Sequence, residues 1–286
     1  MLNTLKLKNY AHGGFPVAFA NSHGNADFTI HSHDFMELVI IFKGKGTHCI
    51  FDREYPIEEG DVFVIPPNVE HGYKNACTLS LFNIMFNLSS FPFIKQYDLQ
   101  TLPGFHLLFE AEPNLRKSHS FKSRLRLSKK TLKYAENHAI KIQRELEDQT
   151  KGFKLATLAS FIDLLVFLSR CSPTTTSPEY QTVYRISEVI SYLENNYSDD
   201  ISLDYLGKIA FLSKRHLLRI FKNATGMTPI GYLLKLRINK ACILLKNTQL
   251  TASQISNEVG FIDSNYFSRQ FKKIMNISPI HYRYKK

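Results

Sequence analysis

The amino-acid sequence predicts an α+β protein of two domains, with a β-barrel and a pair of helices first and an all-α domain after them. Three observations support this division. Short runs rich in Val, Ile, Phe and Tyr alternate with turns over residues 28–86, which is typical of a sandwich or small barrel. Helical periodicity replaces that pattern from about residue 128 onward. Near the C-terminus, one helical stretch occurs twice, about 50 residues apart.

The composition indicates globular domains and one basic region. The chain has 286 residues, a hydrophobic content of 44% and a net charge of +11, which allows two domains with separate cores. From Tyr205 to the C-terminus there are 15 Lys or Arg residues and only two acids, whereas the rest of the chain is nearly neutral. We therefore expect the C-terminal domain to bind a polyanion.

The cysteines and apolar segments indicate the compartment. Four scattered cysteines without a CxxC pair favour free thiols in a reducing cytosol. The N-terminus lacks the apolar segment of a signal peptide. The longest apolar stretch, Leu155–Leu168, is too short to span a bilayer and is expected to be a buried helix. These features predict a cytoplasmic protein without a membrane partner.

The β-domain is expected to consist of short strands that end at turns. Turns are predicted at Gly44-Lys45-Gly46, Asp52-Arg53 and Glu59-Gly60-Asp61, and Pro66-Pro67 ends a further strand. The predicted strands are Leu38–Phe42, Thr47–Phe51, Val62–Ile65 and Leu79–Phe86.

Four side chains in this region form a constellation of candidate ligands: His31, His33, Glu37 and His71. Residues two apart on a strand point the same way, so His31 and His33 are expected to share a face. Three imidazoles and a carboxylate suit a divalent transition metal. The alternative to a metal site is that these side chains line a polar pocket or form hydrogen bonds at a strand edge.

The spacing of these residues resembles the two motifs of the cupin family. The first motif is matched by His31, His33, Glu37 and Gly44, and the second by Gly60, Pro66, His71 and Asn75, with Asn68 in place of a Gly. The resemblance covers roughly residues 24–86 and implies a cupin-like β-barrel with a ligand cavity at its mouth. Cupin-like sensor domains of transcription regulators keep this pattern while binding a small organic effector. The four residues are therefore candidate effector-binding residues and, alternatively, candidate metal ligands; no other cofactor is implied.

The stretch Leu102–Arg116 resembles one found in sugar-responsive regulators, including rhamnose-type ones, which implies a carbohydrate effector. The alternative is a connector that packs across the barrel.

Two helices and a linker are expected in the middle of the chain. Ser128 is the predicted N-cap of a helix that runs to about Asp148, and a second helix runs from about Phe153 to Leu168. The second helix is apolar on most sides and so needs more than one neighbour, either within the chain or across a homodimer interface. We expect an effector-binding and dimerisation domain at 1–170, a linker at 171–181 and a DNA-binding domain at 182–286.

The C-terminal domain contains an internal duplication. Leu206–Pro229 aligns with Ile255–Pro279, at an offset of 49 before the turn and 50 after it. Each copy reads as a helix, a turn and a second helix, which is the helix-turn-helix plan. The predicted N-caps of the second helices are Ser213 and Asp263, and Gly226 and Asn276 are expected to end them. A long helix from Thr228-Pro229 to about Lys246 joins the copies, and a leading helix is expected from about Thr182.

Helical phase separates the core from a basic surface. At 100° per residue, Leu217, Phe221, Phe267 and Phe271 face inward. The candidate DNA-contacting residues on the two second helices are Lys214, Arg215, Leu218, Arg219, Lys222, Ser264, Asn265, Ser268, Arg269 and Lys272. Arg can bind guanine and Asn can bind adenine through two hydrogen bonds each. Further basic residues are expected to contact phosphates: Lys240, Lys273, Arg283, Lys285 and Lys286, together with Lys214.

This domain resembles the AraC/XylS family of bacterial transcription regulators. The residues that carry the resemblance are Gly260-Phe261, Phe267, Arg269, Phe271-Lys272 and Ser278-Pro279. The resemblance implies that double-stranded DNA is the partner and that two helix-turn-helix units enter successive major-groove segments ~34 Å apart. It also implies activation of transcription through RNA polymerase. Phe211 departs from the pattern, because the first turn usually has a Gly there.

Three functions are consistent with these patterns. The favoured one is a sugar-responsive, sequence-specific DNA-binding regulator. A metal-dependent cupin enzyme with a DNA-targeting domain is the second, and metal analysis would separate it from the first. A sequence-blind nucleic-acid binder is the third, and it would lack a large ratio of specific to nonspecific affinity.

Overall fold

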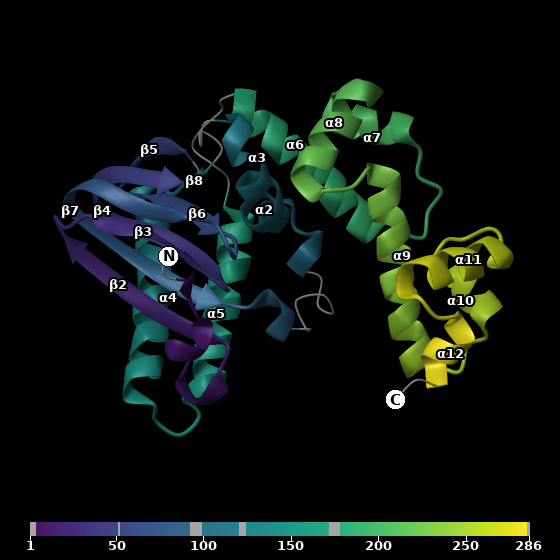
Figure 1. Cartoon of the computed structure of the whole chain (residues 1–286), viewed down its shortest axis with the longest axis horizontal. Helices are drawn as coiled ribbons and strands as arrows, with labels where there is room; N and C mark the ends of the chain where they lie inside the picture. The colour runs from purple at the N-terminus through teal and green to yellow at the C-terminus, as the bar shows by residue number, and fades with distance from the viewer. Residues whose placement is uncertain (1–3, 51, 92–98, 120–123, 172–177, 285–286) are drawn as a thin grey trace. The chain divides into compact units, whose positions relative to one another are not determined.

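The computed structural model describes residues 4–50, 52–91, 99–119, 124–171 and 178–284 (Figure 1). The chain divides into two compact units, Met1–Ser187 and Glu188–Lys286, and each is described by itself. Among the described helices, none has the length and hydrophobicity that crossing a membrane requires.

The first unit contains an eight-stranded sheet built around two long strands, β4 (Met36–Ile50) and β7 (His71–Phe86), which pair antiparallel. The shorter strands are β1 (Thr4–Leu5), β2 (Val17–Gly24), β3 (Phe28–His33), β5 (Arg53–Glu58), β6 (Asp61–Ile65) and β8 (Leu125–Arg126). At the two ends of the strand order, β1 pairs parallel with β3 and β8 pairs antiparallel with β6. Strands β2 and β3 pair antiparallel with β7, and strands β5 and β6 pair antiparallel with β4.

Two of the expected strand boundaries were wrong. The predicted strands Leu38–Phe42 and Thr47–Phe51 belong to the single strand β4, and Phe51 itself lies outside the described residues. The last strand begins at His71 and not at Leu79. Gly44 marks a bulge in β4 where the register with β7 shifts, because its φ is +80° and a Cβ there would overlap the Thr78 carbonyl. The glycine therefore bends a strand that continues beyond it.

Alternation along β4 sends side chains to two different cores. Val39 and Ile41 pack inside the barrel with Phe63 and Tyr73. Leu38 and Ile40 face the other way, into a larger core that the helices complete. Because the side-chain period of a strand is two, Glu37 lies on the inner side with Val39.

Helices α4 (Lys129–Asp148) and α5 (Phe153–Arg170) pack together and contribute to the larger core (Figure 1). Ser128 caps α4 by accepting a hydrogen bond from the Thr131 amide, as predicted. The sugar-regulator-like stretch Leu102–Arg116 forms buried helical turns, α2 (Pro103–His106), a π-helical turn η5 (Leu107–Ala111) and α3 (Glu112–His119). It thus packs against the barrel, and its fully buried Arg116 is ion-paired to Glu112 and donates to the Val64 carbonyl.

The remaining elements are helices: α6 (Pro178–Asn195), within which the unit boundary falls, and in the second unit α7 (Leu203–Ala210), α8 (Lys214–Thr225), α9 (Pro229–Asn247), α10 (Ala252–Glu258), α11 (Ser264–Met275) and α12 (Pro279–Tyr284). The first of these begins at Pro178, four residues before the expected start at Thr182, because Pro is readily accommodated in a first helical turn. Residues 178–181 are therefore helical, and residues 172–177 of the expected linker lie outside the described part of the chain.

The expected duplication is present in the fold. Ser213 caps α8 and Asp263 caps α11 through their side-chain oxygens, while Gly226 and Asn276 end these helices in the left-handed conformation. Phe211 occupies the first turn with φ 52°, so this turn keeps a left-handed residue without a glycine. The helix-turn-helix geometry is thus retained at the cost of an unfavourable backbone conformation at Phe211.

Candidate effector site and DNA-binding surface

Three strands bring the His/Glu cluster together inside the barrel. His31 and His33 come from β3, Glu37 from β4 and His71 from the start of β7, where it pairs with His31. The Nε2 atoms of His33 and His71 lie 3.0 and 3.2 Å from the same oxygen, Oε2 of Glu37. The rings of His31 and His71 are 4.4 Å apart between centroids. The sequence-predicted set therefore forms one cluster, of which His33, Glu37 and His71 are buried.

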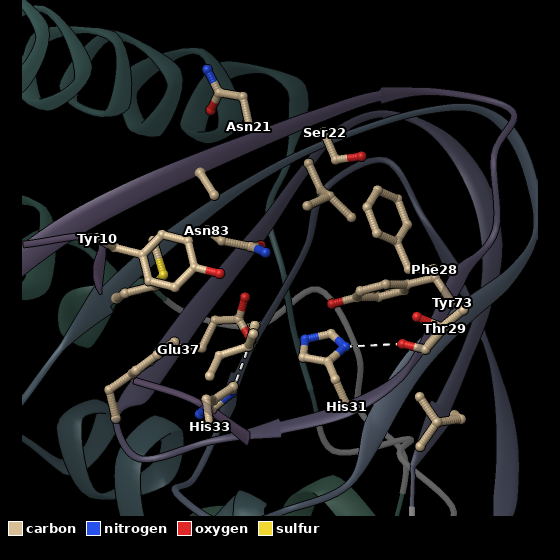
Figure 2. Close-up of a pocket in the computed structure, with 16 residues that line it drawn as sticks. Tyr10, Asn21, Ser22, Phe28, Thr29, His31, His33, Glu37, Tyr73 and Asn83 are labelled. Carbon is tan, nitrogen blue, oxygen red and sulfur yellow. Dashed lines mark hydrogen bonds and ion pairs between the residues drawn. The ribbon is translucent and has the colours of Figure 1, made fainter. Parts of the chain in front are cut away.

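Backbone hydrogen bonds fix the tautomers of two of these rings. The Nδ1 of His71 donates to the Val69 carbonyl at 3.0 Å. The Nδ1 of His31 donates to the Thr29 carbonyl at 2.9 Å, as Figure 2 shows. A carbonyl can only accept, so each ring carries its proton on Nδ1 and, when neutral, a lone pair on Nε2. Metal-binding histidines have this arrangement, with the outer nitrogen donating to a carbonyl.

The tautomer of His71 creates an electrostatic conflict with Glu37. The Nε2 lone pair of a neutral His71 would face the carboxylate oxygen at 3.2 Å, and two acceptors at this distance repel. A second proton on the ring, or a cation bound to both atoms, removes the repulsion. Candidate metal-ligand atoms of His33, Glu37 and His71 lie within 4.8 Å of one another.

The cluster keeps Glu37 ionised. Burial raises the pKa of this carboxyl group, but hydrogen bonds and charge interactions with His33 and His71 outweigh burial, so the pKa lies below its ordinary value. Burial lowers the pKa of His31, which disfavours its charged form. The site therefore presents the Glu37 carboxylate and the Nε2 lone pair of a neutral His31, which are ligands for a cation and acceptors for hydroxyl groups.

A cavity of about 320 Å³ opens beside the cluster. Its described polar lining comprises Tyr10, Asn21, Ser22, Thr29, His31, His33, Glu37, Tyr73 and Asn83. Its apolar lining comprises Leu5, Ala20, Phe28, Ile30, Phe35, Leu81 and Met85. His71 is 1% exposed and is absent from this lining, so it reaches the cavity through Glu37.

Sequence reasoning missed the polar residues on the far strands. Figure 2 shows the Tyr73 hydroxyl and the Asn83 amide directed toward the space near Glu37 and His31. The Tyr73 hydroxyl and Asn83 Oδ1 are buried and have no hydrogen-bond partner among the described residues. Alternation along β7 could have identified Asn83, because Leu81 and Met85 line the same cavity. No local signal connects Tyr10, near the N-terminus, to this site.

On the second unit, helices α8 and α11 expose the faces that helical phase predicted. Arg215, Arg219 and Lys222 are exposed on α8, and Leu218 is half-buried. Lys214 is exposed and pairs with Asp204 at 2.8 Å. The opposite face of α8 is buried through Leu217, Ile220, Phe221 and Ala224.

The second copy repeats the arrangement on α11. Asn265, Arg269 and Lys272 are exposed, Ser264 and Ser268 are half-buried, and Phe267 and Phe271 form the buried side. Among the expected phosphate contacts, Lys273 is exposed and Arg283 donates to the Leu250 carbonyl. Lys240 lies over the Tyr197 ring at 5.2 Å, and Lys285 and Lys286 lie outside the described residues.

The sequence matches known families in both units. Residues 16–149 match the AraC-like ligand binding domain, and residues 206–285 match a helix-turn-helix domain. The HTH-type transcriptional activator RhaR of Mannheimia succiniciproducens is 30% identical over 271 residues, covering 94% of this chain and 91% of that protein. The chain belongs to the AraC family of transcription regulators.

The chain is similar to two further proteins. The HTH-type transcriptional activator RhaS of Enterobacter sp. (strain 638) is 30% identical and covers 93% of this chain and 91% of that protein. The solved C-terminal domain of the two-component response regulator yesN from Fusobacterium nucleatum is 38% identical, covers 33% of this chain and 93% of that domain, and has a TM-score of 0.32. The expected regulator is confirmed, and the relatives give the alternative of an enzyme no support.

Proposed function

We propose that this AraC-family chain is a transcription activator whose binding to DNA is controlled by a small sugar in the barrel cavity. Relatives with RhaR and RhaS names, both transcriptional activators, match more than nine-tenths of the chain and support activation. The observation that carries the effector part is the cavity next to Glu37, toward which two buried polar atoms, the Tyr73 hydroxyl and Asn83 Oδ1, are directed without a hydrogen-bond partner in the described part of the chain. An unmade hydrogen bond costs free energy that a bound ligand would recover.

The chemistry of the lining favours a monosaccharide. A cavity of about 320 Å³ is at the small end of ligand pockets, which are roughly 300–1,000 Å³. Glu37 and Asn83 Oδ1 accept hydrogen bonds from sugar hydroxyls, and the Tyr73 hydroxyl donates one. Phe28 and Phe35 cover the C–H faces of the ring on the apolar side. His31 and His33 complete the polar side, and His71 positions Glu37.

The same four residues fit a divalent metal. His31, His33, Glu37 and His71 would hold it, because two backbone-fixed rings leave Nε2 lone pairs for the ion and a buried carboxylate supplies charge. When bound, the ion would act as a Lewis acid toward sugar hydroxyls. The residues of this chain position the sugar through Tyr73 and Asn83 with or without an ion.

A thermal-shift screen of the full chain against monosaccharides tests this site, because a ligand that binds the folded state raises the melting temperature. Runs with chelator and with added Zn²⁺ or Mn²⁺ separate the metal from the sugar. A sugar that stabilises the wild type but not Tyr73→Phe or Asn83→Ala supports the proposal. A sugar that stabilises all three proteins equally contradicts it.

For DNA recognition, we propose that the α8 and α11 faces enter the major groove. Arg215, Arg219, Asn265 and Arg269 would contact base edges, with Leu218, Ser264 and Ser268 beside them. Lys214, Lys222 and Lys272 would contact phosphates, and Lys214 would exchange its exposed pair with Asp204 for a phosphate. Both faces are exposed and basic, which supports this assignment.

We further propose a homodimer in the cytoplasm that recruits RNA polymerase. On α5, Leu155 is 73% exposed, Ala159 is exposed, and Ile162 and Val166 are half-buried, at spacings of four, three and four residues. That spacing is the seam of a coiled coil, which supports a second copy at this face. Effector binding and dimerisation are assigned to residues 1–170 and DNA binding to the helices from 178 onward. Measuring the molecular mass in solution tests the interface: we expect a dimer for the wild type and a monomer for Leu155→Glu.

A further inference from the structure

The second unit contains a contact between its two helix-turn-helix parts that lies away from both recognition helices. The segment between α6 and α7 belongs to the first part and includes Ser198. Gly260 forms the turn between α10 and α11 in the second part, with φ +84°. A Cβ at Gly260 would overlap the Ser198 carbonyl and Cα. This glycine therefore serves two purposes, a left-handed turn and the close approach of another backbone segment.

One arginine of the joining helix α9 bonds to the same segment. Arg237 donates from Nε to the Tyr197 carbonyl and from Nη2 to the Asp199 carbonyl, both at 2.7 Å. Its guanidinium group also lies over the ring of Phe261, 5.6 Å from the centroid. Phe261 is 4% exposed and follows Gly260 in the second turn. Arg237 thus contacts the first part through two carbonyls and the second part through an aromatic face.

The contact extends to the recognition surface. A cleft at this junction is lined by Arg237, Gly260 and Phe261, and also by Tyr266 and Arg269 of α11. Tyr197 packs against the apolar core of the second part, and Lys240 lies over its ring. A change in the position of the Tyr197–Asp199 segment would therefore alter the surroundings of the helix proposed to read the second DNA segment.

We propose that Arg237, the two carbonyls it binds and the Gly260 approach set the distance and angle between α8 and α11. Arg237 is a positioning residue, which acts through Phe261 and the 197–199 segment. A planar guanidinium can bond two carbonyls at once in a fixed orientation, which an ammonium group on a flexible chain cannot do. The proposal rests on the proposed DNA contacts of both helices, because only a protein that uses both is sensitive to their separation.

The consequence is a requirement for one spacing between two DNA elements. Inserting one base pair moves the second element by about 3.4 Å and rotates it by about 34° in B-DNA. A rigid pair of recognition helices loses contacts on such a site, whereas a loosened pair adjusts. Arg237 would therefore make the protein discriminate between spacings, in addition to any effect on affinity.

The test uses the full chain and a duplex selected by the wild type from random DNA, with its two elements located by footprinting. Affinity is measured on this duplex and on versions with one base pair inserted or removed between the elements. For the wild type we expect a loss of about 30-fold or more on the altered duplexes. For Arg237→Ala and Arg237→Lys we expect about tenfold weaker binding to the selected duplex but less than about fivefold further loss on the altered ones. These values follow from ~1–3 kcal/mol for each mismatched contact.

Two controls make the result decisive. Lys235→Ala removes a charge from an exposed position of the same helix and should leave the spacing dependence unchanged. Circular dichroism melting identifies a variant that has unfolded, and Gly260→Ala provides a second way to disturb the contact. Folded Arg237 and Gly260 variants that keep the full wild-type spacing dependence overturn the proposal. Wild-type binding that is insensitive to spacing and to Arg219→Ala would instead overturn the two-helix DNA contact on which it rests.

Discussion

The Nε2 atom of His71 lies 3.2 Å from Oε2 of Glu37, while Nδ1 of the same ring donates to the Val69 carbonyl. This relationship makes Glu37 the centre of the barrel site. The ionised Glu37 carboxylate faces the His71 ring, whose neutral form has only a lone pair on Nε2, so the two atoms repel each other. A proton or a metal cation between them removes this repulsion. The response of this pair to metals and sugars therefore reports on the proposed sensor.

Glu37→Gln should abolish metal binding in the barrel. The substitution removes the ionised ligand but keeps the shape of the side chain, and the remaining imidazoles lose the charge that offsets desolvation of an ion. We expect stoichiometric divalent metal in wild-type protein incubated with Zn²⁺ or Mn²⁺ and dialysed, and none in the variant. Glu54→Gln, which changes an exposed acid paired to Lys74, is the matched control. Elemental analysis that finds equal metal in all three proteins would contradict the assignment.

The stability of the barrel should fall in mild acid through His48. Burial and the positive charge of Arg116 hold the pKa of this histidine well below its ordinary value. Its unfolded-state pKa is about 6.5, so the unfolded chain takes up the proton first as the pH falls. The contribution to stability is complete above about pH 6.5 and is lost as the pH drops toward the folded-state pKa, by at most about 1.4 kcal/mol per pH unit.

His48→Phe should reduce this pH dependence. Phe can keep the stacking of His48 on Phe63 and Tyr73, whose centroids lie 4.8 and 5.2 Å away, but cannot bind a proton. Urea unfolding between pH 7.5 and 5 measures the slope for both proteins. If the variant has the slope of the wild type, another group causes the loss of stability.

Phe211→Gly should stabilise the second unit. Phe211 has φ 52°, in the left-handed region, and its side chain is 77% exposed, so little burial is lost on removing it. A non-glycine residue in this conformation costs about 1–2 kcal/mol, part of which the greater freedom of glycine in the unfolded chain offsets. We expect a gain of about 0.5–1 kcal/mol in the free energy of unfolding. Phe211→Ala keeps the Cβ and should gain less; an equal gain would point to the exposed ring instead of the backbone.

Replacing Arg219 or Arg269 by Ala should weaken binding to the selected duplex by ~1–3 kcal/mol and relax base preference at one position. The reason is that each Arg can form two hydrogen bonds to a guanine. Lys272→Ala is the comparison, since a phosphate contact should weaken binding to all DNA alike and reduce its salt dependence. A fluorescence-anisotropy titration on specific and random duplexes separates the outcomes. Uniform loss on both would identify the arginines as phosphate contacts.

Local signals were enough to predict the second unit. The caps at Ser213 and Asp263, the ends at Gly226 and Asn276 and the buried Phe267 and Phe271 all follow from residues within one helix. Because the duplication repeats each signal at the equivalent position of the second copy, each prediction had two independent observations behind it. The contact between Arg237 and the 197–199 segment was not predicted, because it joins residues about 40 positions apart.

The barrel was predicted less completely because its contacts are non-local. The cupin spacing identified His31, His33, Glu37 and His71, which the fold brings together. Gly44 was interpreted as a turn because a glycine signal is the same in a turn and in a bulge; only the neighbouring strand β7, whose Thr78 carbonyl approaches Gly44, distinguishes them. Tyr10 and Asn83 meet in the cavity from opposite ends of the barrel sequence, and no short-range pattern joins them.

The central claim is that a sugar in the barrel changes DNA binding. The most direct measurement is the affinity of the full chain for its selected duplex, titrated with the sugar that stabilises the protein most. The account predicts a shift in affinity of about fivefold or more for the wild type, as allosteric couplings of 1–3 kcal/mol imply, and no shift for Tyr73→Phe. Equal affinity with and without a saturating sugar that demonstrably binds the cavity would contradict it.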